Sequence, residues 1–346
     1  MNATPRWVFA ASLGLCTAAA LAASAPHAGY RVLHRYTPGD DQGWDYLAVD
    51  AAARRVYVSH GDQVVVLDAD DGKTVGRIGQ LQGVHGIALA PAMHRGWISN
   101  GRSGEVTVFD TRTLKPTATL KATGANPDAI LYDPASNRVF TFNGRSANAT
   151  AFDAASGKTL ATIALPGKPE FAVSDGAGHV WVNIEDKNQL AKLDPKAGKV
   201  LAIWSLAPCE SPSGLALDTA HRRLFSVCDN RTMTVLDADD GHRVASVAIG
   251  NGPDAAAFDS RRGLVYSANG QDGTLTVVHE DDPDHYRVLA TVPTQATART
   301  LALDPHTGHL FLSAAQFAVH TEQGGPHRHP SVLPGSFTVL EVGRSP

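Results

Sequence analysis

The stretch that decides the fold is 211-SPSGLALDTAHRRLFSVCDNRTMTVLDADDGHRVASV-247. It contains four short segments with strand character, GLALD, RLFSV, TMTVLD and RVASV, separated by residues that favour tight turns. Asp240-Gly241 supplies the turn between the third and fourth segments. Close variants of this stretch recur along the chain, so we interpret it as one unit of an internal repeat.

Two series of acidic residues mark the period of the repeat. The first predicted strand of each unit ends in an apolar-Ala-apolar-Asp phrase, and these phrases end at Asp50, Ala90, Asp133, Asp175, Asp218, Asp259 and Asp304. The third predicted strands end near Asp68, Asp110, Asp153, Asp194, Asp237, Glu280 and Glu341. Successive members lie about 42 residues apart, the length of a four-stranded propeller blade. The sequence therefore predicts an all-β fold, a seven-bladed β-propeller of four-stranded antiparallel blades.

The two ends of the repeat region predict how the ring closes. Residues Tyr30 to Tyr36, YRVLHRY, precede the first unit as fourth strands precede later units, whereas the last unit ends at its third strand, SFTVLEV. We expect the N-terminal strand to complete the last blade, because a closed ring leaves only short sheet edges exposed. The last unit also carries a long insertion, residues 315–333.

The first 25 residues of the 346-residue chain have the pattern of a secretory signal peptide. Arg6 precedes an apolar stretch from Trp7 to Leu21, and small residues suited to cleavage follow it. An uncleaved membrane anchor is the alternative, although the stretch is short for a bilayer span. The propeller domain would then occupy residues 26–346, in the periplasm and with no membrane span in the mature chain. The formal charge of −4 does not favour nucleic acid as a partner.

The mature chain would keep two cysteines, Cys209 and Cys228, because Cys16 leaves with the signal peptide. Two cysteines in an oxidising compartment predict one disulfide. The positions support this, because one precedes an inner strand and the other ends the next strand, which brings both to the same face. A pair of free thiols, or a catalytic or metal-binding thiolate, is the alternative.

The units resemble the YVTN-type repeats of the YncE-like seven-bladed propellers, which are exported bacterial proteins. The phrases that carry the resemblance are NPDAILYDPASNRVFTFN at 126–143, CESPSGLALDTAHRRLFSVCDN at 209–230 and HPSVLPGSFTVLEV at 329–342. The chain departs from the repeat at Ala90, where siblings have Asp, and at 280–288, where the turn is stretched. The resemblance implies the fold more firmly than any reaction.

Loops that enter the inner strands, and loops that join second to third strands, share one face of a propeller and surround the mouth of its channel. The first set offers Asp45, His85, Asp128, Glu170, Ser213, Asp254 and Arg299. The second set offers His60, Asn100, Asn143, Glu185, Asp229, Asn269 and Gln316. A concave mouth lined by such groups predicts a ligand site. The alternative is structural, because Asn-Gly pairs form turns and an Asp can cap its own loop.

Two kinds of metal chemistry are compatible with the sequence. Carboxylate and amide oxygens at the mouth suit calcium or magnesium, as in the propeller lactonases that an enzyme of this kind would resemble. His320, His327 and His329 lie close together in the insertion and could bind zinc or copper, although adventitious affinity is the simpler interpretation. The chain has no G-x-S-x-G, H-E-x-x-H, phosphate-loop or C-x-x-C-H motif.

These observations favour an exported binding or scaffold protein that presents a polar channel mouth to a small molecule, a metal ion or a periplasmic protein. A metal-assisted hydrolase of the lactonase kind is the alternative.

Overall fold

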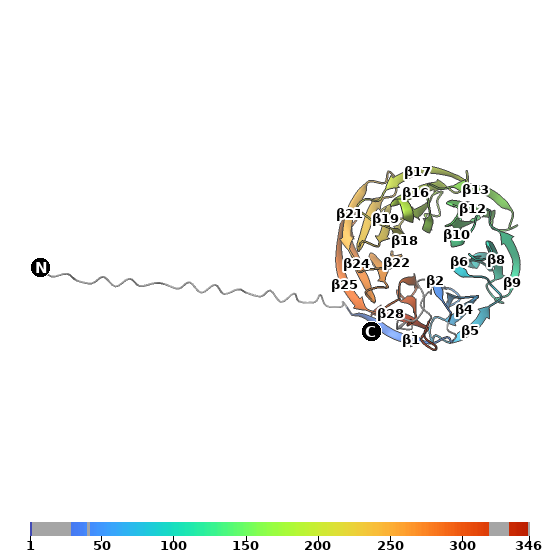
Figure 1. Ribbon diagram of the computed structural model, residues 1–346, viewed down its shortest axis with the longest axis horizontal. Coiled ribbons are helices and arrows are strands. Elements are labelled where there is room, and N and C mark those ends of the chain that lie inside the picture. The colour runs from blue at the N-terminus through green and yellow to red at the C-terminus, as the bar shows by residue number, and fades with distance from the viewer. Residues whose placement is uncertain (2–28, 40–41, 318–331, 345–346) are drawn as a thin grey trace, which may run out of the picture.

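The structure is a computed structural model that describes residues 1, 29–39, 42–317 and 332–344. Over these residues the chain forms seven four-stranded antiparallel sheets that are arranged as blades around a central axis (Figure 1). Blade 1 has the strand order β2-β3-β4-β5, and the five blades that follow repeat this order. The predicted all-β seven-bladed propeller is confirmed.

Each blade runs outward from the axis, one strand after another. The innermost strands are β2 (Trp44–Asp50), β6 (Val84–Ala90), β10 (Pro127–Asp133), β14 (Pro169–Ser174), β18 (Pro212–Asp218), β22 (Pro253–Asp259) and β26 (Thr300–Leu303). The second strands are β3 (Arg55–His60), β7 (Arg95–Asn100), β11 (Arg138–Asn143), β15 (Val180–Ile184), β19 (Arg223–Cys228), β23 (Leu264–Asn269) and β27 (Leu310–Ala314).

The two outer layers complete the blades. The third strands are β4 (Gln63–Asp68), β8 (Glu105–Asp110), β12 (Asn148–Asp153), β16 (Gln189–Asp194), β20 (Thr232–Asp237), β24 (Thr274–Asp282) and β28 (Thr338–Arg344). The outermost strands are β5 (Thr74–Ile78), β9 (Pro116–Lys121), β13 (Thr159–Ala164), β17 (Lys199–Ser205), β21 (Arg243–Ala248), β25 (His285–Pro293) and β1 (Tyr30–Tyr36). Two 3₁₀ turns, η1 (Pro91–Met93) and η2 (Glu185–Lys187), lie between strands.

Blade 7 is assembled from both ends of the described chain. Strand β1 pairs antiparallel with β28, from Tyr30 opposite Arg344 to Tyr36 opposite Val339, so that blade 7 has the order β1-β28-β27-β26. The Tyr36 hydroxyl also donates a hydrogen bond of 2.6 Å to Glu341 of β28. This pairing confirms the closure predicted from the sequence, and Figure 1 shows β1 beside β28 on the circumference.

Apolar side chains fill the spaces between neighbouring blades. Each of the seven blade interfaces in the described chain has its own buried cluster. Trp97 and Phe152, for example, meet between blades 2 and 3, and Tyr57 and Phe109 meet between blades 1 and 2. Because each sheet is apolar on both faces, it gains stability only when a neighbour covers each face.

A β-bulge near the start of the inner strands turns the predicted mouth residues toward the axis. Trp44 pairs with His60, and Leu47 pairs with Val58. Between these pairs β2 has two residues, Asp45 and Tyr46, opposite the single residue Ser59 of β3. The same irregularity occurs in β6, β10, β14, β18 and β22, at the positions of His85, Asp128, Glu170, Ser213 and Asp254. A bulge re-aims side chains that a regular strand would direct elsewhere.

Cys209 and Cys228 form a disulfide, as the sequence predicted, with their Cα atoms 5.5 Å apart. Two other sequence-based predictions, the signal peptide up to Ala25 and the metal-binding cluster of His320, His327 and His329, fall outside the described residues apart from Met1. Within the described chain, no helix has the length and apolar character needed to span a lipid bilayer.

Removal of residues 1–36 is expected to destabilise the ring severely, because it leaves β28 as an open edge and removes the Tyr36–Glu341 hydrogen bond. The melting temperature measured by circular dichroism should fall, and gel filtration should show association. A chain that starts at Gly29 retains β1 and is the matched control. Equal melting temperatures for the two truncations would show that β1 does not close the ring.

Replacing both disulfide cysteines, as Cys209→Ala with Cys228→Ala, should lower the free energy of unfolding by about 3 kcal/mol, because the bond closes a loop with a sequence separation of 19. Urea unfolding measured by fluorescence checks this. Reducing agent should destabilise the wild-type protein by a similar amount and leave the double variant unchanged.

Candidate functional site

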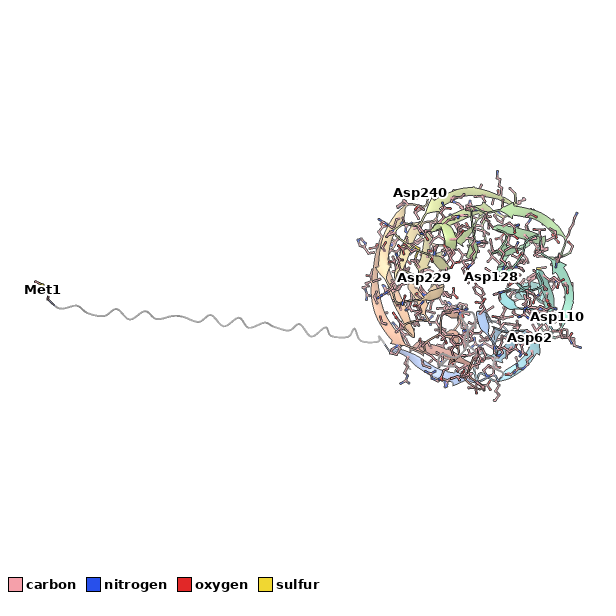
Figure 2. The ribbon with its side chains drawn as sticks, viewed as in Figure 1. Met1, Asp62, Asp110, Asp128, Asp229 and Asp240 are labelled. Carbon is pink, nitrogen blue, oxygen red and sulfur yellow. A yellow bond between two sulfur atoms is a disulfide. The ribbon has the colours of Figure 1, made fainter. Side chains whose placement is uncertain are left out.

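The six bulges bring side chains from six different blades to one end of the channel. Figure 2 shows that Asp128 and Asp229 lie near the axis, whereas Asp110 and Asp240 lie at the outer edge of the ring. In blade 7 the corresponding side chain is Arg299, which lies immediately before β26. The side chains that the sequence analysis assigned to the loops entering the inner strands therefore lie at the same end of these strands.

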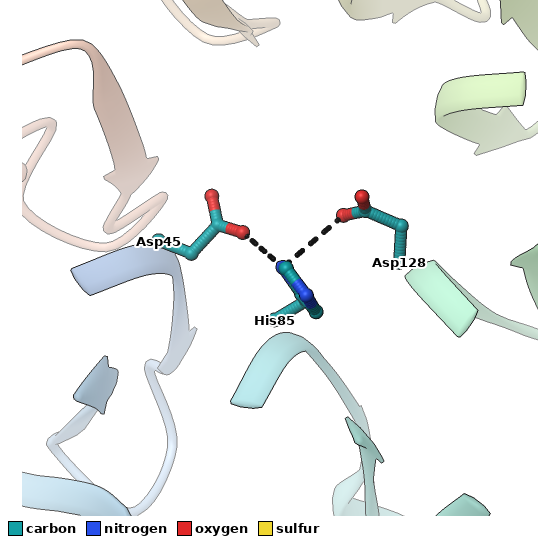
Figure 3. Close-up of side chains that lie close together, drawn as sticks. All are labelled: Asp45, His85 and Asp128. Carbon is teal, nitrogen blue, oxygen red and sulfur yellow. Dashed lines mark hydrogen bonds and ion pairs between the residues drawn. The ribbon is translucent and has the colours of Figure 1, made fainter. Parts of the chain in front are cut away.

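Asp45, His85 and Asp128 form a cluster at this mouth (Figure 3). The His85 Nδ1 atom lies 2.6 Å from Asp45 Oδ2 and 3.6 Å from Asp128 Oδ1, so the imidazole bridges carboxylates of blades 1 and 3. One donor atom from each residue lies within 4.8 Å of the others. Gly101 makes room for the ring, because a Cβ at this position would lie 2.6 Å from His85 Nε2.

Burial and mutual charge alter the titration of this cluster. Burial by itself lowers the pKa of His85, but the hydrogen bond to Asp45 and the charge of Asp128 outweigh it and raise the pKa. Burial raises the pKa of Asp128 to about 6, and the charge of Asp45 adds to this effect while His85 opposes it. Protons and cations therefore compete for the same oxygens near neutral pH.

A second cluster joins the neighbouring carboxylates to one lysine. Lys168 Nζ lies 2.6 Å from Glu170 Oε1 and also donates a hydrogen bond to Glu185. Glu170 is only 8% exposed, and burial together with the charge of Asp128 raises its pKa, against the influence of Lys168. One ammonium group therefore serves two carboxylates, and the mouth keeps an excess of negative charge.

Arg299 balances the opposite side of the mouth. Its Nε lies 2.7 Å from Asp254 Oδ2, and its Nη2 lies 3.9 Å from Asp45 Oδ1. Burial raises the pKa of Asp254 to about 6, although Arg299 opposes this effect. The guanidinium thus ties blade 7 to blades 6 and 1 at the level of the cluster.

The predicted residues at the ends of the second strands lie deeper. Asn100, Asn143 and Asn269 are buried, and each donates a hydrogen bond of 2.9–3.0 Å to a threonine hydroxyl in its own blade. His60 is fully buried and stacks on Phe337, with ring centroids 4.0 Å apart. These four side chains support the loops of the mouth from below, whereas Glu185 and Asp229 line the open part of it.

Sequence reasoning missed the polar groups that stabilise the bulges. Ser59 Oγ donates to the Tyr46 carbonyl, Ser99 Oγ donates to the Asp128 carbonyl, and Asn183 Nδ2 donates to the Ser213 carbonyl. The available signal was a Ser or Asn at the next-to-last position of four apolar second strands: Ser59, Ser99, Asn183 and Ser313. Lys168 was missed as well, because nothing in the repeat indicates it.

Two aromatic side chains from blades 1 and 4 meet below the mouth. The rings of Tyr46 and Phe171 have centroids 5.6 Å apart, and a void of 50 Å³ lies beside them. Burial first, and then the charges of Asp128 and Glu170, raise the pKa of Tyr46. An apolar recess of 430 Å³, which includes Leu217 and Phe258, lies along the inner strands on the other side. The contact between the two rings therefore narrows the channel below the mouth.

Two pockets of similar size open beside the cluster. One, of 560 Å³, is lined by Glu185, Asp229 and Asp254, and the other, of 570 Å³, by Asp45, His85 and Arg102. Arg299 lines both. Their size is that of sites for small molecules.

Comparison with known proteins identifies the kind of repeat. The model of a PQQ-like repeat family, described as outer membrane protein assembly factor BamB, matches residues 145–318, just over half of the chain. The chain belongs to this BamB-type family. A structure of Kuenenia stuttgartiensis hydrazine synthase superposes with a TM-score of 0.71 at 15% sequence identity, covering 79% of this chain and 93% of that chain. That likeness shows the fold alone. No curated protein matches the chain in sequence.

Membership of the BamB-type family accounts for the blade architecture and leaves the chemistry of the mouth to be argued from this chain. The matched residues include Glu170, Asp254 and Arg299, whereas Asp45, His85 and Asp128 lie before them. The cluster in Figure 3 is therefore formed by the blades outside the matched region.

The free energy of unfolding should depend on pH through Asp128. Its pKa is about 6 in the folded protein, against an ordinary value of 3.8. Between these pH values the folded protein keeps a proton that the unfolded chain has lost, so the stability contributed by this group falls as pH rises. In Asp128→Asn this fall should be smaller by roughly 2 kcal/mol between about pH 4 and pH 7, as urea titrations can measure.

Asp110→Asn provides a control of opposite sign. Backbone hydrogen bonding from Thr113 lowers the pKa of Asp110, so its loss should remove stability that is present at neutral pH and lost in acid. Identical pH profiles for wild type and Asp128→Asn would contradict the burial argument.

Proposed function

We propose that this protein is an exported, periplasmic binding protein whose propeller mouth holds a divalent cation between Asp45, His85 and Asp128. The observation that carries the proposal is the convergence of three donor atoms, from three separate blades, within 4.8 Å of one another. An ion pair that only joins two blades needs one acidic and one basic side chain. In this cluster two carboxylates share a single imidazole, so one negative charge has no basic partner within the cluster.

The electrostatics of the mouth support a cation in particular. Burial raises the pKa of Asp128 and Asp254 to about 6 and raises that of Glu170 as well. The positive charge and solvent around these carboxylates therefore stabilise their ionised forms less than water does. A divalent ion would offset this repulsion and favour the ionised carboxylates. Lys168 pairs with Glu170, and Arg299 pairs with Asp254 at 2.7 Å and lies farther, 3.9 Å, from Asp45.

The donor set also favours a class of ion. Calcium and magnesium prefer all-oxygen sites, whereas imidazole nitrogen with carboxylate oxygen suits zinc or manganese. His85 takes the place where most sibling blades have a carboxylate, so we propose zinc or manganese before calcium or magnesium. The three protein donors would leave coordination positions open toward the mouth.

Two finer proposals accompany this function. The signal-like segment at residues 1–25 supports export to the periplasm. The phrases at 126–143 and 209–230 support a YVTN-type, YncE-like subgroup within the BamB-type repeat propellers.

A hydrolase of the lactonase kind is a second candidate, and the two pockets of 560 and 570 Å³ beside the cluster are the observation that favours it. A divalent cation held by Asp45, His85 and Asp128 would polarise an ester carbonyl or activate a water molecule. Lactone or ester turnover that requires metal and is lost in Asp128→Asn would establish this candidate. Metal binding without turnover leaves the binding function alone.

Cation binding should weaken at least tenfold in His85→Ala and in Asp128→Asn, because each variant removes one of three donors. Affinity in the wild-type protein should rise from about pH 5 to about pH 7, because the proton leaves Asp128 over this range, and the raised pKa of His85 should extend the rise to higher pH. Isothermal titration calorimetry with Zn²⁺, Mn²⁺, Ca²⁺ and Mg²⁺ on chelator-treated protein measures both effects.

Asp62→Asn is the matched control, because Asp62 is an exposed aspartate in the loop between β3 and β4 and lines neither pocket. Wild-type affinity in this variant is expected. If Asp62→Asn loses cation binding, or if His85→Ala and Asp128→Asn both keep it, the ion binds at another place.

A further inference from the structure

The two pockets beside the cation cluster differ in charge. Carboxylates of Glu185, Asp229 and Asp254 line the pocket on the side of blades 4 to 6, with Arg299 as the single guanidinium. The other pocket, on the side of blades 1 to 3, is lined by Arg102, Arg145 and Arg299 against one carboxylate, that of Asp45. The mouth is therefore divided into an acidic half and a basic half.

Two of the three arginines of the basic pocket have no carboxylate partner among the described residues. Arg299 pairs with Asp254 at 2.7 Å, but Arg102 and Arg145 form no ion pair with any residue that the structure describes. The single carboxylate of the pocket, Asp45, is already held by His85 at 2.6 Å. Two guanidinium groups thus face one pocket with their hydrogen-bond donors available to a ligand.

The pocket has an apolar wall as well as basic groups. Trp44 and Val84 line it, and Trp44 is fixed in place by stacking on Phe317, with ring centroids 5.6 Å apart. Gly83 makes room for Arg102, because a Cβ at Gly83 would lie 3.2 Å from Arg102 Cβ. A volume of 570 Å³ admits a small organic molecule as well as an inorganic ion.

We propose that this pocket binds a small organic anion, with its carboxylate or phosphate group between Arg102 and Arg145 and its carbon skeleton against Trp44. Guanidinium groups bind both kinds of oxyanion through paired, charge-assisted hydrogen bonds. The inference goes beyond the cation site and does not require it. Asp45 and His85 line the same pocket, so a cation held by them would add to the attraction of an anion without being its only partner.

Benzoate and phenyl phosphate test the proposal, because they have the same ring and differ in the oxyanion. Calorimetric titration of the wild-type protein at low salt should show binding of at least one of them, and the stronger one identifies the head group. Arg102→Gln and Arg145→Gln should each weaken binding about tenfold, and the double variant should abolish it.

Arg231→Gln is the matched control, because Arg231 is an exposed arginine in the same kind of loop, between β19 and β20, and lines neither pocket. Its affinity should equal that of the wild type. Circular dichroism melting curves verify that all variants fold. Unchanged affinity in the double variant, equal losses in Arg231→Gln, or no binding of either probe would overturn the proposal.

Titrations with and without chelator separate this inference from the proposed cation site. Anion binding that survives in chelator and is lost in the double arginine variant supports the arginine pocket, even if no cation binds. Anion binding that requires the cation and ignores both arginines overturns the arginine pocket while supporting the cation site.

Discussion

Burial of both faces of every sheet is the constraint on which the rest of this structure depends. A blade has apolar side chains on its two faces, and each of the seven interfaces in the described chain buries a separate cluster. The only arrangement that covers every face is a closed ring, and closure requires β1 to pair with β28. Position in the ring then determines which side chains approach the axis and which face solvent.

Crowding at the axis follows from this closure and shapes the mouth. Small residues stand where neighbouring inner strands come closest. A Cβ at Gly214 would lie 2.6 Å from the backbone of Ala255, and one at Gly86 would lie 3.0 Å from the Asp128 carbonyl. Tyr46 and Phe171 meet near the axis and narrow the channel. The bulges direct polar side chains into the mouth above them.

Function in this protein depends on differences between otherwise similar blades. A perfectly repeated acidic residue at every bulge would create only repulsion near the axis. His85, Ser213 and Arg299 break the repetition, and they divide the mouth into a cluster suited to a cation, an acidic pocket and a basic pocket. Lys168 moderates the repulsion further by pairing with two acids at once. The low dielectric near the axis makes each of these substitutions matter more than it would on an exposed surface.

The sequence by itself determined the number of blades, the strand that closes the ring and the disulfide. These features follow from local patterns, namely the period of the Asp-ended strands, the missing fourth strand and the positions of Cys209 and Cys228. Only the tertiary structure decided that Asp45, His85 and Asp128 meet, that Asn100, Asn143 and Asn269 are buried, and that Arg102 and Arg145 share a pocket. The reason is physical: which members of a ring of loops lie within a few ångströms depends on bulges, rotamers and the packing of separate blades, and a repeat pattern carries no information on these.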